Sequence, residues 1–398
     1  MALFNRKKKR EGSGNDENGE RKKEKGSWRR PANTAFKQQR LKAWQPILTP
    51  KTVLPTLFII GIIFAPIGAL LVWGSSLVSE MTFDYTDCWN LTNSSSPDNL
   101  QWQNMSTYSY NLRSSDAGAT IPTPQYAYLF NDSASQDEKH SCFIQFNIVS
   151  DLQPPVFQYY RLTNFYQNNR RYVQSLDSAQ LQGQYRDASS LSNSNCKPLA
   201  VTSDGKVIYP CGLIANSKFN DTILGFRPTS DTSGNSDYNF TQSGIAWPGE
   251  AKKYSATSGY VGNFDEIVPP PNWALMYPNN YTDDNPPPNL QEDEHFQNWM
   301  RTAGLPTFSK LYGRNDGSTL PAGQYRVQIF YNFPVQGYKG TKSLVISTVS
   351  WIGGKNPFLG WAYVAAAAVF VLLAVAGTIR HLVRPRRLGD MTLLSWNR

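Results

Sequence analysis

The chain has 398 residues, enough for a sizeable folded core, and a formal net charge of +9. Residues 1–51 hold fifteen of its Lys and Arg side chains and residues 380–398 hold five more, so the middle of the chain is mildly acidic while both ends are basic. This uneven distribution argues against reading the high isoelectric point as a sign of nucleic-acid binding.

Residues 1–32 are charged and nearly devoid of aliphatic side chains, a composition that predicts a disordered basic tail. Its basic clusters at 7–10 and 21–23 are compatible with a nuclear signal or a lipid-surface patch. A solvated cytosolic tail that enforces membrane topology is the favoured interpretation.

The next segment, 33–51, mixes apolar side chains with cations. Phe36 to Trp44 is compatible with a short amphipathic helix that ends at Pro46, and Trp44 suits a membrane interface. The segment is either a simple interfacial anchor or a docking element for the cytosolic face of a partner. Its residues alone do not choose between the two.

Two stretches, 52–79 and 356–379, contain no charged side chain and are rich in apolar residues. About 20 apolar residues span the ~30 Å hydrocarbon core of a bilayer as a helix, so both are predicted transmembrane helices rather than buried helices of a soluble protein. Small residues at 365–368 and at Gly377 predict that the second helix packs closely, either on the helices of a partner or on the first helix.

The cations that flank these stretches predict the topology. Arg40, Lys42 and Lys51 precede the first stretch, and Arg380 begins a basic cluster after the second. Positive flanks stay in the cytosol, which puts both termini, including the tail 380–398, in the cytosol and residues 80–355 in the lumen or outside the cell.

Two features of 80–355 agree with that placement. All four cysteines fall in it, and an oxidising compartment allows them to pair. Four cysteines allow three connectivities; sequence proximity favours Cys196–Cys211, which leaves Cys88–Cys142. All of the Asn-x-Ser/Thr sequons also lie there, which predicts N-linked glycans at Asn90, Asn93, Asn104, Asn131, Asn220, Asn239 and Asn280.

The same segment predicts a mainly-β domain between the membrane helices. Strand-like runs occur at 142–148, 325–331 and 343–349, and short helices are expected near 164–175 and 296–305. We expect one antiparallel β-sandwich with long loops and a few short helices, flanked by the two transmembrane helices.

Residues for chemistry are scarce. The chain has only three histidines, and it lacks the HExxH, CxxC, Walker A, GxSxG and dinucleotide-binding patterns. We therefore predict no metal, no cofactor and no catalysis. The basic and aromatic run 161–172 would lie on the non-cytosolic side, which argues against nucleic-acid binding. A receptor, an adhesion protein or an accessory subunit remain open.

Longer segments resemble a known family over about residues 33–382. The chain is similar to the non-catalytic β-subunits of type-four P-type ATPases, the lipid flippases, also called the ligand-effect modulator or cell-division-control-protein-50 family. With only four cysteines it is most similar to the simpler fungal-type members. The segments that carry the resemblance are NTAFKQQR (33–40), AWQPILTP (43–50), YYRLTNFYQNNRRYV (159–173), PCGLIANS (210–217), FNDT (219–222), GIAWP (244–248), MRTAGLPTFSKLYGR (300–314) and NPFLG (356–360).

The resemblance implies a helper of a pump that moves phospholipid from the exoplasmic to the cytosolic leaflet. Such subunits bind the catalytic α-subunit as a heterodimer and support its folding, its exit from the endoplasmic reticulum and its activity, at the Golgi, endosomes or plasma membrane. The Asp-Lys-Thr-Gly phosphorylation motif of the pump is absent here. Besides the pump, contacts with membrane lipids and N-linked glycans are expected.

The predicted contacts with the pump come from both membrane-proximal regions. The segment 33–50 would meet its cytosolic membrane edge, and the small-residue face of 362–377 would pack on its helices. The residues assigned to these contacts are Phe36, Arg40, Trp44, Trp361 and Tyr363. The alternative is a free-standing membrane-anchored receptor or adhesion glycoprotein, and the transported lipid cannot be named from this chain.

Overall fold

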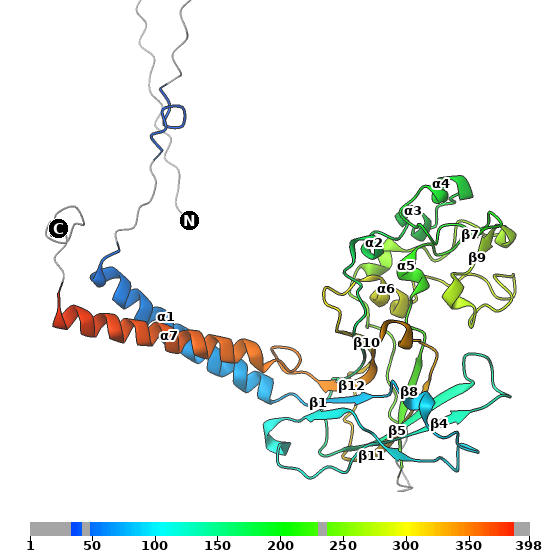
Figure 1. The fold of residues 1–398 in the computed structure, drawn as a ribbon, viewed down its shortest axis with the longest axis horizontal. Coiled ribbons are helices and arrows are strands. Elements are labelled where there is room, and N and C mark those ends of the chain that lie inside the picture. Colours follow the sequence, from blue (N-terminus) through cyan, green and yellow to red (C-terminus); the bar gives the residue numbers. More distant parts are fainter. Residues whose placement is uncertain (1–32, 42–47, 230–236, 386–398) are drawn as a thin grey trace, which may run out of the picture.

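The computed structural model describes residues 33–41, 48–229 and 237–385. A pair of long helices projects from one side of a β-rich ectodomain, and a group of short helices and loops lies on the upper right, off the line of the helix pair (Figure 1). Two apolar helices flanking a mainly-β domain is the fold class that the sequence predicts.

The long helices are α1 (Pro50–Ser76) and α7 (Pro357–Val383). Each has 27 residues and is long and apolar enough to cross a membrane. Thr49 begins α1 with a capping box to Thr52, and α1 continues through two internal prolines. In Figure 1 the two helices lie side by side.

Glycines allow the two helices to approach at backbone distance. A Cβ atom on Gly68 would lie 2.9 Å from the backbone N of Val364, and one on Gly360 would lie 2.7 Å from the backbone N of Val72. Gly377 likewise meets Leu54. Within 362–377, Gly377 and the buried Ala367 thus pack on the first helix of the same chain, whereas Ala365 and Ala368 are exposed, and their packing on a partner stays a prediction.

The ectodomain contains two five-stranded antiparallel sheets that enclose a common core. Rings from the two sheets meet directly, as where Phe83 and Phe146 lie 4.9 Å apart. The first sheet has the order β10 (Phe308–Asn315), β6 (Val156–Leu162), β12 (Lys342–Thr348), β1 (Glu80–Asp84) and β3 (Tyr108–Asn111). The second has the order β2 (Gln103–Asn104), β4 (Gln125–Phe130), β5 (His140–Ile148), β11 (Gly323–Phe330) and β8 (Thr222–Pro228).

The three strands expected from the sequence are present as β5, β11 and β12, shifted by one or two residues at their ends. In β6 burial alternates along the whole strand, whereas every residue of β12 is buried. Alternation marks a strand with one face toward the core, and continuous burial marks a strand covered on both faces.

A second hydrophobic cluster forms the upper part of the ectodomain. Buried aromatic side chains such as Tyr260, Trp273 and Phe296 fill it, and Leu176 and Met300 pack against both this cluster and the sandwich core. It contains α2 (Arg170–Val173), α3 (Ser178–Leu181), α4 (Ala188–Ser192), α5 (Leu213–Asn216), α6 (Glu294–Met300) and the parallel pair β7 (Val207–Ile208) and β9 (Ile267–Val268). Single 3-10 turns occupy Cys88–Asn90, Ser114–Asp116, Glu250–Lys253, Phe264–Glu266, Pro271–Trp273 and Gln336–Tyr338.

The two helices expected in this region are shorter than predicted. The first comprises only α2, because Asn164 adopts a positive φ of 56° and Asn169 caps a helix that starts at the next residue. The second is α6, which starts at the cap Asp293 and ends before Arg301 turns to an extended conformation.

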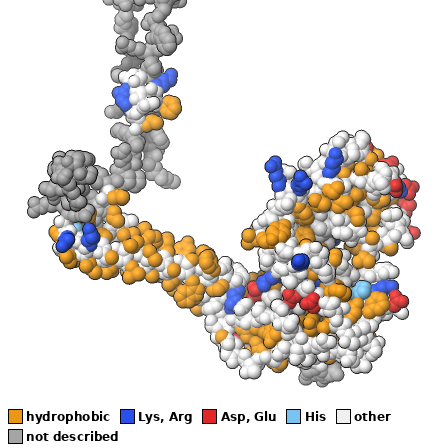
Figure 2. Space-filling model, in the orientation of Figure 1, with side chains coloured by type: hydrophobic (Ala, Val, Ile, Leu, Met, Phe, Trp, Pro, Cys, Tyr) orange, Lys and Arg blue, Asp and Glu red, His pale blue; other side chains and the backbone are white. Residues whose placement is uncertain are grey.

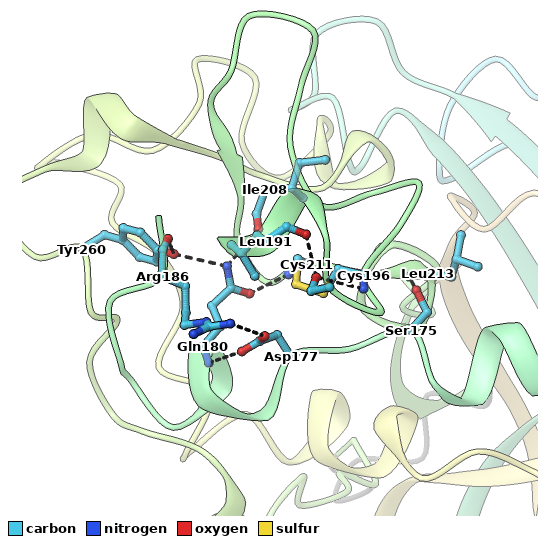
Figure 3. Close-up of a disulfide and its surroundings, with 11 residues drawn as sticks. Ser175, Asp177, Gln180, Arg186, Leu191, Cys196, Ile208, Cys211, Leu213 and Tyr260 are labelled. Atoms are coloured by element: carbon cyan, nitrogen blue, oxygen red, sulfur yellow. Dashed lines mark hydrogen bonds and ion pairs between the residues drawn. A yellow bond between two sulfur atoms is a disulfide. The ribbon is translucent and has the colours of Figure 1, made fainter. Parts of the chain in front are cut away.

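Two disulfides tie the ectodomain together, Cys88–Cys142 and Cys196–Cys211. These are the pairings that sequence proximity favours. Figure 3 shows the second, where the Gln180 amide accepts from the backbone N of Cys211 at 2.9 Å and donates to the carbonyl of Ile208 at 3.1 Å. Closing a loop of about fifteen residues is worth ~3 kcal/mol in the chain-entropy model.

A buried ion pair links the first sheet to the start of β8. The Lys342 ammonium lies 2.7 Å from the Asp221 carboxylate, and both side chains are fully buried. Asp221 also accepts from the hydroxyl of Tyr85 and the backbone N of Asn332, and Lys342 donates to the carbonyl of Phe333. Burial lowers the pKa of Lys342 to about 8, although Asp221 acts in the opposite direction.

We expect Asp221→Asn to destabilise the ectodomain by ~3–5 kcal/mol, because it leaves a buried ammonium without its counter-charge. It keeps the Asn-x-Thr sequon at Asn220, so glycosylation is not removed at the same time. The free energy of unfolding in urea, measured on the purified full chain in detergent, tests this.

The matched control is Asp237→Asn, whose partner Arg227 is 74% exposed and whose own side chain is 44% exposed. An exposed ion pair contributes at most ~1 kcal/mol. Equal losses for the two variants would contradict a stabilising role for the Lys342 pair.

Gly68→Leu should separate α1 from α7, because the new side chain would collide with the backbone of α7. The Lys355 amine at the base of the pair donates to the carbonyls of Val78 and Leu112, each at 2.8 Å. Loss of these contacts would make the chain more susceptible to trypsin after Lys355. Ala69→Leu, on the exposed side of α1, is the control. Equal cleavage rates in the two variants would refute this packing.

Candidate partner-binding surfaces

The part of the chain that the structure describes has no candidate metal centre. Among its residues there is no group of three or more His, Cys, Asp or Glu side chains that could hold a metal ion. His140 is 2.6 Å from the Tyr128 hydroxyl and stacks on its ring. His295 is half-buried, and desolvation of its ring lowers its pKa to about 4. The features that remain are surfaces suited to binding.

The first feature is the junction that fixes the helix pair on the sandwich. Strand β1 starts just after α1, and β12 ends just before α7, and the two strands are hydrogen-bonded neighbours with Glu80 opposite Ser347. The Ser75 hydroxyl accepts from the backbone N of Asn356 at 3.0 Å. Together with the Lys355 contacts described above, these bonds set the direction of the helices relative to the ectodomain.

The outer face of the helix pair is apolar along its length, with positive charge at the end away from the ectodomain (Figure 2). Trp73, Trp351 and Phe358 are exposed where the helices meet the ectodomain. Lys51 and Arg380 lie at the opposite end of the same antiparallel pair. Interfacial aromatics and flanking cations are typical of the two boundaries of a membrane.

The residues predicted to bind a partner along α7 differ in accessibility. Trp361 is 59% exposed and free for a partner. Tyr363 is half-buried, and its ring lies 5.0 Å from that of Phe64 on α1. Tyr363 therefore contributes to packing within the chain.

The N-terminal segment differs from its predicted helix. Residues 35–39 form turns, with Arg40 N donating to Ala35 O at 2.7 Å, and Gln39 has a positive φ of 52°. That left-handed residue stops helical propagation. Phe36 is 76% exposed and Arg40 is also exposed, its guanidinium bonded to Asn33. Trp44 lies outside the described residues.

A third surface is formed by exposed side chains on three segments of the ectodomain, most of them loops, and we call it the loop surface. All of its members are exposed, and most are large apolar or aromatic side chains. It comprises Tyr166, Val173, Trp247, Arg301 and Leu305.

Hydrogen bonds between side chains and the backbone bring these segments together. The Asn168 amide donates to the carbonyl of Gly304 at 3.0 Å, and Ala303 N donates to the Gln167 side chain at 2.8 Å. The Arg301 guanidinium lies 4.5 Å above the Trp247 ring. A cation over an aromatic face holds both side chains in place, so the loop surface is built in advance of any partner.

Two further residues, Glu294 and Lys310, hold the backbone of the segments that carry the loop surface. The Glu294 carboxylate accepts from the backbone N atoms of Gly244 and Ala246, each at 2.9 Å, which fixes the loop that carries Trp247. Lys310 is buried, and its ammonium donates to the carbonyls of Asn298 and Arg301 at the end of α6. Burial, with a smaller contribution from Arg301, lowers the pKa of Lys310 to about 7.

The loop surface was not assigned from the sequence, although 159–173, 244–248 and 300–314 were singled out for their resemblance. The signal was the presence of apolar residues such as Leu305 and Trp247 beside turn-forming Gly and Pro. Two of the converging loops are more than 130 residues apart in the chain, as the bond from Asn168 to Gly304 illustrates at a separation of 136.

The asparagines of the predicted glycosylation sites lie at the surface, with one difference among them. Six are exposed, whereas Asn220 is half-buried. The side-chain oxygen Oδ1 of Asn220 is enclosed without a protein partner. The exposed ones are Asn90, Asn93, Asn104, Asn131, Asn239 and Asn280.

Comparison with known proteins gives consistent results. The sequence profile of the LEM3 (ligand-effect modulator 3) family / CDC50 family matches residues 71–387. The chain is 41% identical to the phospholipid-transporting ATPase accessory subunit CDC50 of Chaetomium thermophilum, over 92% of this chain and 91% of the relative.

Similar proteins occur in other organisms. The accessory subunit CRF1 of Saccharomyces cerevisiae is 41% identical, over 92% of this chain and 89% of that protein. Cell cycle control protein 50A of Bos taurus is 42% identical, over 87% of this chain and 88% of its own length. With a family profile that matches most of the chain and relatives of this similarity and coverage, the chain belongs to the LEM3/CDC50 family.

Proposed function

We propose that this protein is the non-catalytic accessory subunit of a phospholipid-transporting P-type ATPase. The observation that carries the proposal is the similarity, along nearly the whole chain, to fungal proteins named as accessory subunits of such pumps.

In this proposal the helix pair crosses the membrane, both termini are cytosolic and the ectodomain lies in the lumen or outside the cell. The cations at Lys51, Arg380 and Arg384, and the aromatic side chains at the other end of the pair, support this orientation. The two disulfides and the exposed sequons fit an oxidising, glycosylating compartment between the endoplasmic reticulum and the plasma membrane.

The shape of the molecule suggests how it would hold a pump. The ectodomain extends well to one side of the helix axis, so a membrane protein beside α1 and α7 would lie beneath the overhanging part (Figure 1). The segment that joins α6 to β10, which carries Arg301 and Leu305, is on the side of the ectodomain that faces the helices (Figure 1). The loop surface would then contact the exoplasmic loops of the pump.

Contacts in the membrane and at its cytosolic edge would add to this. Trp361 on the outside of α7 is available to the helices of the pump. Phe36, Arg40 and Trp44 are proposed to meet its cytosolic edge; the first two are exposed, as a docking element requires. Separate contact regions in the membrane and on the ectodomain would stabilise the pump in one orientation during folding and export.

A free-standing receptor or adhesion glycoprotein is the alternative. Isolation of the full chain from its own membranes in mild detergent distinguishes the two. A companion with the size and peptides of a P-type ATPase on a native gel supports the accessory subunit, and migration of the chain alone would reject it.

Leu305→Asp should lower recovery of the ATPase with the tagged chain by about tenfold, since a charge replaces an exposed apolar anchor at an interface centre. Leu305 is 69% exposed, so the folded ectodomain loses little by the change. The measurement is quantitative mass spectrometry of the companion after native purification.

Val261→Asp provides the matched control, because Val261 is 67% exposed and lies in the same upper cluster but outside the loop surface. Its recovery of the ATPase should equal that of the unchanged chain. Equal recovery with both variants would show that the loop surface does not contact the pump.

A further inference from the structure

A long groove with apolar walls crosses the ectodomain away from the loop surface. It consists of two cavities with volumes of about 490 Å³ and 600 Å³, which share Leu275, Asn332, Phe333 and Pro334 in their walls. Each lies within the size range of sites for small ligands, ~300–1,000 Å³. Open apolar surface of this extent is typical of a binding site.

The walls combine apolar and amide groups in a pattern that suits a carbohydrate. Leu275 and Trp89, which are 38% and 48% exposed, offer apolar faces, and the buried Phe333 and half-buried Tyr331 lie behind them. Asn272 and Asn332 add amide groups, which both donate and accept hydrogen bonds. Sugar rings have apolar C–H faces and a rim of hydroxyl groups, so both kinds of wall find partners.

A sugar-acceptor asparagine lies in the groove itself. Asn220 is part of the wall of the smaller cavity, and it is the sequon asparagine that is half-buried. Its backbone is anchored, because the next residue is the fully buried Asp221 of the Lys342 ion pair, and its carbonyl accepts from the Asn332 amide. Its carbonyl Oδ1 atom is enclosed without a protein partner.

These positions restrict where a glycan on Asn220 can go. The residue is held by the core on one side, and on the other it lines this groove and a neighbouring cavity of about 190 Å³. We propose that the groove is the seat of the N-glycan of this chain's own Asn220, with the inner sugars packed against Leu275 and Pro334. The inference rests on the lumenal placement of the ectodomain proposed above.

A glycosidase that cleaves at the asparagine tests this on the native, full-length complex. Peptide N-glycosidase in ¹⁸O-labelled water marks each released site, and mass spectrometry then gives the release rate at every sequon. A glycan seated in the groove should leave Asn220 at least tenfold more slowly than the glycan on Asn104, which is on the exposed two-residue strand β2.

A wall variant separates seating from simple crowding at the attachment point. Leu275→Ser removes one apolar wall at a side chain that is 38% exposed, and it should raise the release rate at Asn220 but not at Asn104. Val261→Ser makes the same kind of apolar-to-polar change at an exposed side chain outside the groove, and it should alter neither rate.

The outcomes are distinct. An unoccupied Asn220, release at Asn220 as fast as at Asn104, or no response to Leu275→Ser would each overturn the groove proposal. Slow release at Asn90, Asn93 or Asn131 in place of Asn220 would assign the groove to another glycan and overturn it as well. A chain with no glycan at any sequon would instead reject the lumenal placement, and with it both proposals.

Discussion

The architecture depends on one constraint, the pairing of β1 with β12 in the first sheet. Because β1 follows α1 and β12 precedes α7, their hydrogen-bonded register forces the two membrane helices to leave the sandwich side by side. Glycines then allow the helices to touch at their backbones, and Lys355 bonds two carbonyls at the base. Helix α1, near the start of the chain, is thereby fixed relative to helix α7, near its end.

The rigidity of the ectodomain comes from aromatic packing, disulfides and a buried ion pair. Rings from both sheets meet in the sandwich core, and a second core of buried tyrosine, tryptophan and phenylalanine side chains supports the long insertions. The Lys342–Asp221 pair joins β12 to the start of β8. A domain built in this way keeps the loop surface at a fixed position relative to the long helices. Packed side chains and hydrogen bonds, and not flexible linkers, connect its parts.

Sequence reasoning works where the physical signal is local. Length and apolarity reveal the two long apolar helices, and strand-like residues reveal β5, β11 and β12, with alternation in the case of β11. It is less accurate where tertiary contacts compete with local preference. The helices near 164–175 and 296–305 are shortened, because Asn164 adopts a left-handed turn and Arg301 becomes extended as the chain joins the loop surface. Some of the small residues of α7, such as Ala367 and Gly377, pack on the chain's own first helix, a choice that its composition leaves open.

The residues by themselves determine that the chain has two apolar membrane-length helices, a β-rich domain between them, basic ends and no recognised catalytic motif. These properties follow from composition, length and periodicity, which are readable one segment at a time. The tertiary structure decides which loops share a surface and which sequon asparagine lies in a groove. Both depend on contacts between residues far apart in the chain, such as Asn168 with Gly304 and Asp221 with Lys342, and no local pattern encodes those distances.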